Sequence, residues 1–160
     1  MLNRVLVILA GVLLASVAVA VSQEAASTDV LTGTWNLNTN KSSQSGIERE
    51  SIRIELAGDQ HKFVYDRLGE NGTELNWWFV TDMKGDCVNH TQVNGQPMTS
   101  KSCISRLGPR TFVNDTAILH EKYELSSDGR KMVVHTKFKG HPTGRSLPEQ
   151  KLVFDRVLSQ

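Results

Sequence analysis

Residues 52–56 read Ile-Arg-Ile-Glu-Leu, so apolar and charged side chains alternate with a period of two. In a β-strand this period puts the apolar side chains on one face and the charged ones on the other. The same alternation recurs in Phe63 with Tyr65, in Leu75 with Trp77 and Phe79, in Tyr123 with Leu125, in Met132 with Val134 and Phe138, and in Leu152 with Phe154. No segment after residue 22 carries the apolar stripe of an amphipathic helix. The pattern therefore predicts an all-β protein.

Short motifs rich in glycine, asparagine and aspartate separate these runs and supply the positive φ angles that tight hairpins require. They are Glu70-Asn71-Gly72, Lys84-Gly85-Asp86, Val93-Asn94-Gly95 and Ser127-Asp128-Gly129, with further breaks at Gly108-Pro109 and Gly140-His141-Pro142. Residues 114–124 are the best helical candidate, but we favour a strand there with a bend at Asn114-Asp115. About nine or ten strands at 8–12-residue spacing indicate an antiparallel sandwich or barrel. Because full closure leaves no exposed sheet edge, we predict a single up-and-down β-barrel of about 8–10 strands.

The first 22 residues form a segment of different composition. Arg4 precedes a nearly unbroken apolar run, residues 5–21, which ends in small residues. A basic head, an apolar middle and an A-x-A-like site are the layout of a secretory signal peptide, with cleavage after Ala20 or after Ser22. The alternative is a retained membrane anchor, but a run of about 17 residues is at the short limit for a spanning helix. We therefore expect residues 23–160 to form one exported domain, either secreted or periplasmic.

The charge of that domain excludes two classes of partner. The chain has 18 basic and 17 acidic residues, and removal of Arg4 with the leading segment leaves 17 of each, a formal charge of zero. Nucleic-acid binding depends on a positive field, and membrane-surface binding through charge depends on a basic patch. Since there is no run of like charges, neither partner is predicted.

Cys87 and Cys103 are the chain's two cysteines. In an exported protein such a pair is most simply a disulfide, because the compartment oxidises thiols and no third cysteine competes. The alternative is two buried, unlinked thiols. Neither cysteine belongs to a C-x-x-C pair, so a metal site on them is not expected.

The start of the domain resembles a known group of barrels. Gly33-Thr34-Trp35 at the start of the first expected strand is similar to the G-x-W opening of lipocalins and the wider calycin barrels. More closely, residues 33–42 resemble "G-T-W-x-L-N-x-x-K-S", which opens the mature chain of a largely uncharacterised group of small exported bacterial lipocalin-like proteins. Further pieces of the chain agree with this group: residues 108–112, 127–132 and 153–156. The "L-T-G-x-W" pattern is also similar to the opening of the avidin group, but no later tryptophan set matches a biotin box.

The resemblance implies structural roles for three residues. In lipocalins a basic residue of the last strand packs over the tryptophan of the opening motif, and Arg156 stands at the matching place here. The resemblance thus assigns Gly33, Trp35 and Arg156 to one end of the barrel. The alternative is that Trp35 is an ordinary core residue and that Arg156 extends to solvent.

No catalytic or metal-binding pattern stands out. The five histidines are scattered, without H-x-H or H-E-x-x-H spacing, at positions His61, His90, His120, His135 and His141. There is no G-x-S-x-G elbow, no paired acid and no glycine-rich phosphate loop. We therefore predict no enzymatic activity, no cofactor and no metal.

Two functions remain. The first is binding or carriage of a small apolar molecule inside the barrel, in a cup lined by Tyr65, Trp77, Phe79, Tyr123 and Phe138. Trp78 follows Trp77 on the same strand and so faces the outside. The alternative is a filled barrel that acts as an interaction module through its outer surface, with Trp78 and the polar loop of residues 38–46 as candidate contacts with protein partners.

Overall fold

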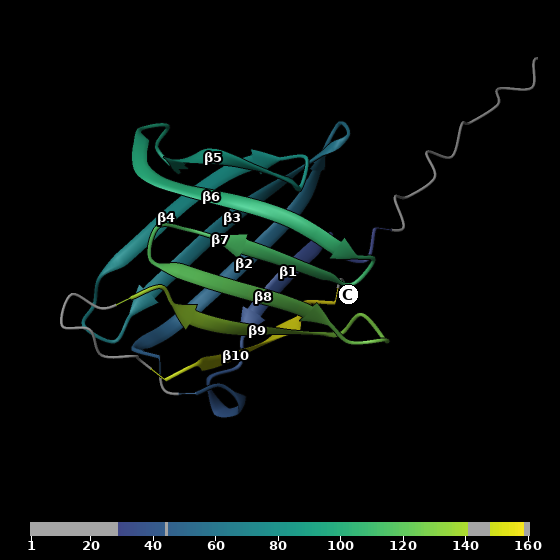
Figure 1. Ribbon diagram of the computed structural model, residues 1–160. Helices are drawn as coiled ribbons and strands as arrows, with labels where there is room; N and C mark the ends of the chain where they lie inside the picture. Colours follow the sequence, from purple (N-terminus) through teal and green to yellow (C-terminus); the bar gives the residue numbers. More distant parts are fainter. Residues whose placement is uncertain (1–28, 44, 141–147, 159–160) are drawn as a thin grey trace, which may run out of the picture.

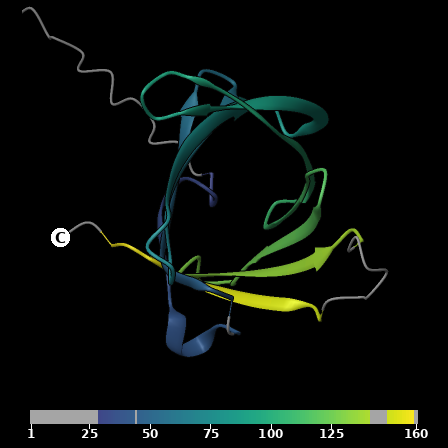
Figure 2. The same ribbon diagram turned by 90° about the vertical axis from the view of Figure 1, so that its left-hand side faces the viewer.

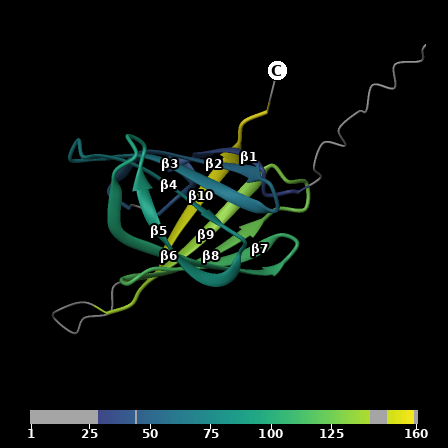
Figure 3. The same ribbon diagram turned by 90° about the horizontal axis from the view of Figure 1, so that it is seen from above.

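The chain folds into a closed barrel of ten antiparallel strands (Figure 1, Figure 3). The computed structural model describes residues 29–43, 45–140 and 148–158, so the expected signal peptide and His141 lie outside the described residues. The strands are β1 (Gly33–Leu37), β2 (Ile47–Ala57), β3 (Gln60–Gly69), β4 (Glu74–Thr81), β5 (Lys84–Gln92), β6 (Pro97–Gly108), β7 (Thr111–Asp115), β8 (Leu119–Leu125), β9 (Lys131–Phe138) and β10 (Gln150–Arg156). A short 3-10 helix, η1 (Thr39–Lys41), follows β1. The described part of the chain contains no helix with the length and apolarity needed to cross a membrane.

The strand order is that of an up-and-down barrel. Each strand pairs with the next along the chain, and β1 closes the ring by pairing with both β2 and β10 (Figure 2). Registers such as Ile52 opposite Tyr65 and Phe63 opposite Phe79 put the apolar members of the alternating runs on one face of the sheet, which becomes the interior. The predicted fold class is confirmed.

Two of the predicted turns lie elsewhere than the sequence indicated. Lys84-Gly85-Asp86 belongs to β5, and the chain reverses before it, at Asp82 and Met83. Gly85 has a φ of 104°, and the pairing of β5 with β6 shifts register between Lys84 and Cys87, so this glycine marks a β-bulge rather than a hairpin.

The second displaced turn is the bend expected at Asn114-Asp115. Both residues belong to β7, and the chain turns at residues 116–118. The Thr116 hydroxyl accepts hydrogen bonds from the backbone N–H groups of Ile118 and Leu119, which fixes the turn two residues later than predicted.

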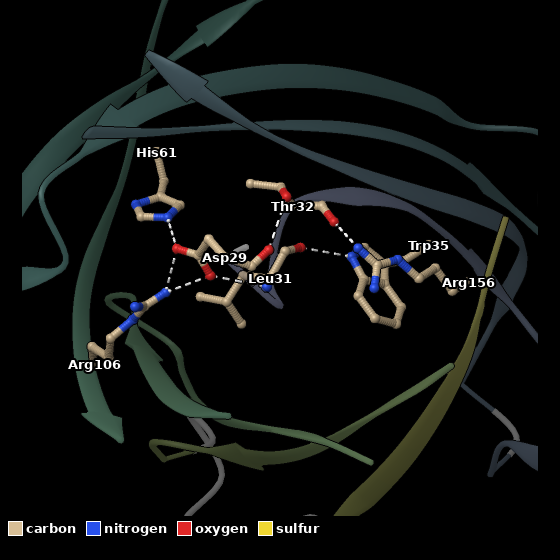
Figure 4. A network of polar contacts seen from close by, with 7 residues as sticks. All are labelled: Asp29, Leu31, Thr32, Trp35, His61, Arg106 and Arg156. Atoms are coloured by element: carbon tan, nitrogen blue, oxygen red, sulfur yellow. Dashed lines mark hydrogen bonds and ion pairs between the residues drawn. The ribbon is translucent and has the colours of Figure 1, made fainter. Parts of the chain in front are cut away.

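The segment before β1 closes one end of the barrel (Figure 4). Leu31 is buried in the core, and its carbonyl accepts a hydrogen bond of 3.1 Å from Nε1 of Trp35. Asp29 lies between two side chains of the wall: its carboxylate is 2.6 Å from Nε2 of His61 and 2.8 Å from Nη2 of Arg106. We call this the closed end; the hairpin that joins β6 to β7 and the one that joins β8 to β9 lie here as well.

Arg156 ties three segments together at the closed end. Its guanidinium lies 5.1 Å from the centroid of the Trp35 ring and donates hydrogen bonds to the carbonyls of Thr32 and Gly129. Gly33, with a φ of 136°, runs directly beneath it, and a Cβ at this position would lie 3.0 Å from Nε of Arg156. The backbone conformation and the close approach of Arg156 both require glycine here.

Candidate functional site

A cavity of about 770 Å³ occupies the half of the barrel away from the closed end. Its outer rim includes Leu75, Met98 and the loop between β7 and β8, and we call this the open end. The core residues toward the closed end are bulky and apolar and include Phe63, Ile104, Phe112, Met132 and Phe154. The barrel is thus packed solid at one end and hollow at the other.

Aromatic side chains form one wall of the cavity. The rings of Tyr65 and Trp77 stack with centroids 4.6 Å apart and planes inclined by 3°. His90 extends the stack, with its ring 5.1 Å from that of Phe79 and 6.1 Å from that of Trp77. Offset stacking of this kind holds flat rings in fixed positions, so the wall is preformed.

Four of the five residues predicted to contact a ligand line this cavity: Tyr65, Trp77, Phe79 and Tyr123. Phe138 does not. It is half-buried in the last position of β9, opposite Leu119, and Leu119 takes the place on the rim instead. Trp78 points to the outer face, where Nζ of Lys62 lies 4.8 Å from the centroid of its ring.

Charged and polar side chains also line the interior, some beside the aromatic wall and some across from it, and Tyr123 is the member of this group that the sequence indicated. Arg67 donates a hydrogen bond of 2.7 Å from Nη2 to Oε1 of Glu50, its neighbour across β2 and β3. On β7 and β8, Oε2 of Glu121 accepts hydrogen bonds of 3.0 Å from Nδ2 of Asn114 and from the Tyr123 hydroxyl. We refer to Glu50, Arg67, Asn114, Glu121 and Tyr123 as the polar cluster.

One signal in the sequence indicates that members of this cluster face inward. Glu50 is in phase with Ile52 and Ile54, and Arg67 is in phase with Phe63 and Tyr65, so each continues the inward-facing series of its strand. A charged residue in phase with the apolar face is buried when the sheet closes. Glu50 is 1% exposed and Glu121 is 8% exposed.

Burial governs the ionisation of the two carboxyl groups. Burial raises the pKa of Glu50 and outweighs the attraction of the Arg67 guanidinium. Burial also raises the pKa of Glu121, against the hydrogen bonds from Tyr123 and Asn114 and the more distant attraction of Arg67. The strands β2 and β3 lie across the ring from β7 and β8, and Arg67 and Glu121 line the same cavity, so the two parts of the cluster face each other across the interior.

Several buried polar atoms of this region have no hydrogen-bond partner among the described residues. They include Oε2 of Glu50, Nε of Arg67, Oδ1 of Asn114 and Oγ1 of Thr136. A buried polar atom without a partner costs about 1–3 kcal/mol, so native proteins keep few of them. Their concentration beside a cavity fits an interior that completes its hydrogen bonds with a bound molecule or with water.

His90 and Ser102 form the pair in the wall that comes nearest to a catalytic dyad. Nε2 of His90 lies 2.7 Å from Oγ of Ser102, and burial lowers the pKa of His90. No carboxylate of the described residues hydrogen-bonds to His90, so the third member of a Ser-His-acid triad is missing there. Among those residues, no three histidine, cysteine, aspartate or glutamate side chains converge into a metal-binding group either.

Cys87 and Cys103 form a disulfide between β5 and β6 beside the cavity, as predicted. The pairing of β4 with β5 is short, with only Trp77 opposite Gln92 and Trp78 opposite Thr91. The disulfide therefore fixes β5 to β6 where β5 has little support from its other neighbour.

No protein-family model matches the sequence, and no curated protein matches it significantly. Solved structures do resemble the fold. A fatty acid binding protein from Schistosoma mansoni, in complex with arachidonic acid, matches with a TM-score of 0.56 at 10% identity, over 81% of this chain and 97% of that chain. The zebrafish ileal bile acid-binding protein, complexed with cholic acid, matches with a TM-score of 0.49 at 17% identity, over 80% of this chain and 99% of that chain. At these identities the likeness concerns the fold, and the chain shares the barrel architecture of the Schistosoma protein.

Proposed function

We propose that this protein binds a small, mostly apolar molecule inside its barrel. The observation that carries the proposal is the cavity of about 770 Å³ beside the stacked Tyr65–Trp77 wall. Sites for small molecules typically measure about 300–1,000 Å³ and combine apolar walls with a few placed polar groups. The solved barrel from Schistosoma mansoni, which shares this architecture, holds arachidonic acid, and this supports a long apolar chain as the first class of ligand to test.

The filled-barrel alternative requires an interior packed throughout by side chains. Small barrels are often packed in that way, and the closed end of this one is. The open end departs from it, because the cavity lies over the polar cluster. The binding proposal accounts for this hollow half, whereas an interaction module that acts through its outer surface has no use for it.

The proposed setting is extracellular or periplasmic. It rests on the signal-peptide layout of residues 1–22 and on the resemblance of the opening motif to small exported lipocalin-like proteins. Mass spectrometry of the protein recovered from the medium or periplasm of its host tests it. A mature chain that begins at Val21 or at Gln23 is expected, and a chain that retains Arg4 would contradict it.

Tryptophan emission tests the binding proposal directly. Decan-1-ol has an apolar chain, no charge and no absorbance near that of indole, so it reports on contact with the wall alone. We expect it to saturate with a blue shift of the emission, because it displaces water from the Trp77 ring.

Two matched variants place the ligand. Trp77→Phe should abolish the shift, and Trp78→Phe should retain it, because Trp78 lies on the opposite face of the same strand. An unchanged wild-type spectrum together with no heat of binding by calorimetry would refute the proposal. A shift that disappears in Trp78→Phe instead would place the ligand on the outer surface and support the alternative.

A further inference from the structure

Two buried acceptors lie together in the cavity wall, the carboxyl group of Glu121 and Oδ1 of Asn114, and they point to the chemistry of the ligand's polar end. The Arg67 guanidinium hydrogen-bonds to Glu50 and interacts with Glu121 through charge alone. Asn114 donates its Nδ2 to Glu121 and so keeps its carbonyl oxygen, Oδ1, buried and unpartnered in a residue that lines the cavity.

The cation of the polar cluster is engaged by Glu50 on one side, while its Nε is buried without a hydrogen-bond partner among the described residues. Nη2 of Arg67 is 2.7 Å from Glu50, and the guanidinium lies 5.3 Å from the centroid of the Trp77 ring. A ligand carboxylate would place a third acid around this one arginine, beside two carboxyl groups whose charged forms burial already disfavours. Oδ1 of Asn114 is an acceptor and cannot bond to a carboxylate, so a ligand carboxylate would leave this buried atom without a partner, whereas a cation would not.

The charged side chains on the rim of the cavity do not favour a carboxylate either. Nζ of Lys139 is 2.5 Å from Oδ1 of Asp115, so that lysine is neutralised by its own neighbour. Lys101 is exposed on β6 at the edge of the cavity, where solvent and salt screen its charge. Glu121 and Asn114 are buried and lie in lower dielectric, so their interactions with a ligand are stronger.

We propose that the ligand is an amphiphile whose polar end is a primary amine, held as the ammonium by Glu121 and by Oδ1 of Asn114, with its apolar chain against the Tyr65–Trp77 wall. An ammonium supplies three hydrogen-bond donors, no acceptor and a positive charge, which is the complement of these two oxygen acceptors. Binding ionises Glu121, since an adjacent cation favours the carboxylate form. This inference rests on the proposed function and gives its ligand a chemical class.

Three probes of equal chain length distinguish the contribution of the head group to affinity from that of the apolar chain. They are decylamine, decan-1-ol and decanoate, each used below its micellar concentration. We expect calorimetry at neutral pH to give a dissociation constant for decylammonium at least tenfold below that for decanoate. A ratio below ten would overturn the head-group inference. If decan-1-ol still binds in that case, the proposed function stands. If none of the three probes binds, the proposed function itself fails.

Glu121→Gln identifies the source of the preference. It retains an oxygen for the Asn114 and Tyr123 donors and removes the ionisable group, so the affinity for decylammonium should fall about tenfold while that for decan-1-ol changes little. Glu124→Gln is the matched control, because Glu124 lies on the same strand but faces outward. Folding of both variants is checked by circular dichroism. An unchanged affinity for decylammonium in folded Glu121→Gln would overturn the inference.

Discussion

Replacement of Glu121 by glutamine should make the protein more stable at neutral pH. Burial raises the pKa of this carboxyl from its usual value of 4.5, so the folded state favours the protonated form. The glutamine side chain resembles that form: both hydrogen bonds of the wild type end on the same oxygen, Oε2, and an amide oxygen can accept both. The variant therefore keeps the local contacts and removes the need to ionise a buried group.

The sign and size of the effect follow from proton linkage. The contribution of Glu121 to stability is fully present below pH 4.5, where folded and unfolded chains are both protonated at this position. Above pH 4.5 the unfolded chain ionises first, so the wild type loses stability at up to about 1.4 kcal/mol per pH unit until the folded-state pKa is reached. The stability difference between Glu121→Gln and wild type should therefore widen as the pH rises through this window and then level off.

Urea unfolding followed by tryptophan emission, between pH 4.5 and about pH 8, measures this difference. Glu124→Gln provides the baseline, since its carboxyl is partly exposed on the outer face of the same strand. A difference that stays constant or shrinks with rising pH would refute the account of Glu121 as a carboxyl kept neutral by burial.

Three further predictions concern the closed end and the disulfide. Asp29→Asn should destabilise the protein at neutral pH and weaken the dependence of its free energy of unfolding on pH in the acid range. Burial would raise the pKa of Asp29, but hydrogen bonds to its carboxylate outweigh this effect and lower the pKa. The stability that Asp29 contributes is therefore present above pH 3.8 and is lost as the pH falls through the lower pKa of the folded state. If urea unfolding shows the same loss of stability at acid pH in Asp29→Asn as in the wild type, this account is wrong. Arg156→Met should lower the free energy of unfolding by about 2–3 kcal/mol, because the contact with Trp35 and two hydrogen bonds are lost. A thermal midpoint within about a degree of wild type would show that these contacts do not stabilise the protein. Replacement of Cys87 and Cys103 by serine should cost about 3 kcal/mol for a loop of 16 residues, measured by urea unfolding against the oxidised wild type, and equal midpoints would argue against the entropic account.

The barrel could be predicted from the sequence because the pattern that indicates it lies within single strands. A period of two, as in residues 52–56, sets which face of a strand is buried whatever its neighbours are. The position of Trp77 on the inner face and of Trp78 on the outer face follows from the same rule and agrees with the structure. Gly85 shows the limit of local evidence, since a positive φ serves a bulge as well as a hairpin, and only the pairing of β5 with β6 decides between them.

The polar cluster could not be identified as a site from the sequence, because its members come from four different strands. Glu50, Arg67, Asn114 and Glu121 are each ordinary residues of an alternating strand, and what unites them is the closure of the sheet. Which charged residue faces inward is readable from its phase. Which of them meet across the interior depends on the registers and on the size of the barrel, and these arise from the whole set of pairings.

The energetic cost of this cluster supports a binding role over a filled barrel. Two buried carboxyl groups with raised pKa values, and several unpartnered polar atoms, all reduce stability, while the apolar packing of the closed end supplies it. Residues that break the local rules of folding without a structural gain are expected at functional sites. If that is their role here, Glu121→Gln should be the more stable protein and the poorer binder of decylammonium, a pairing that neither a structural carboxyl nor a surface charge would produce.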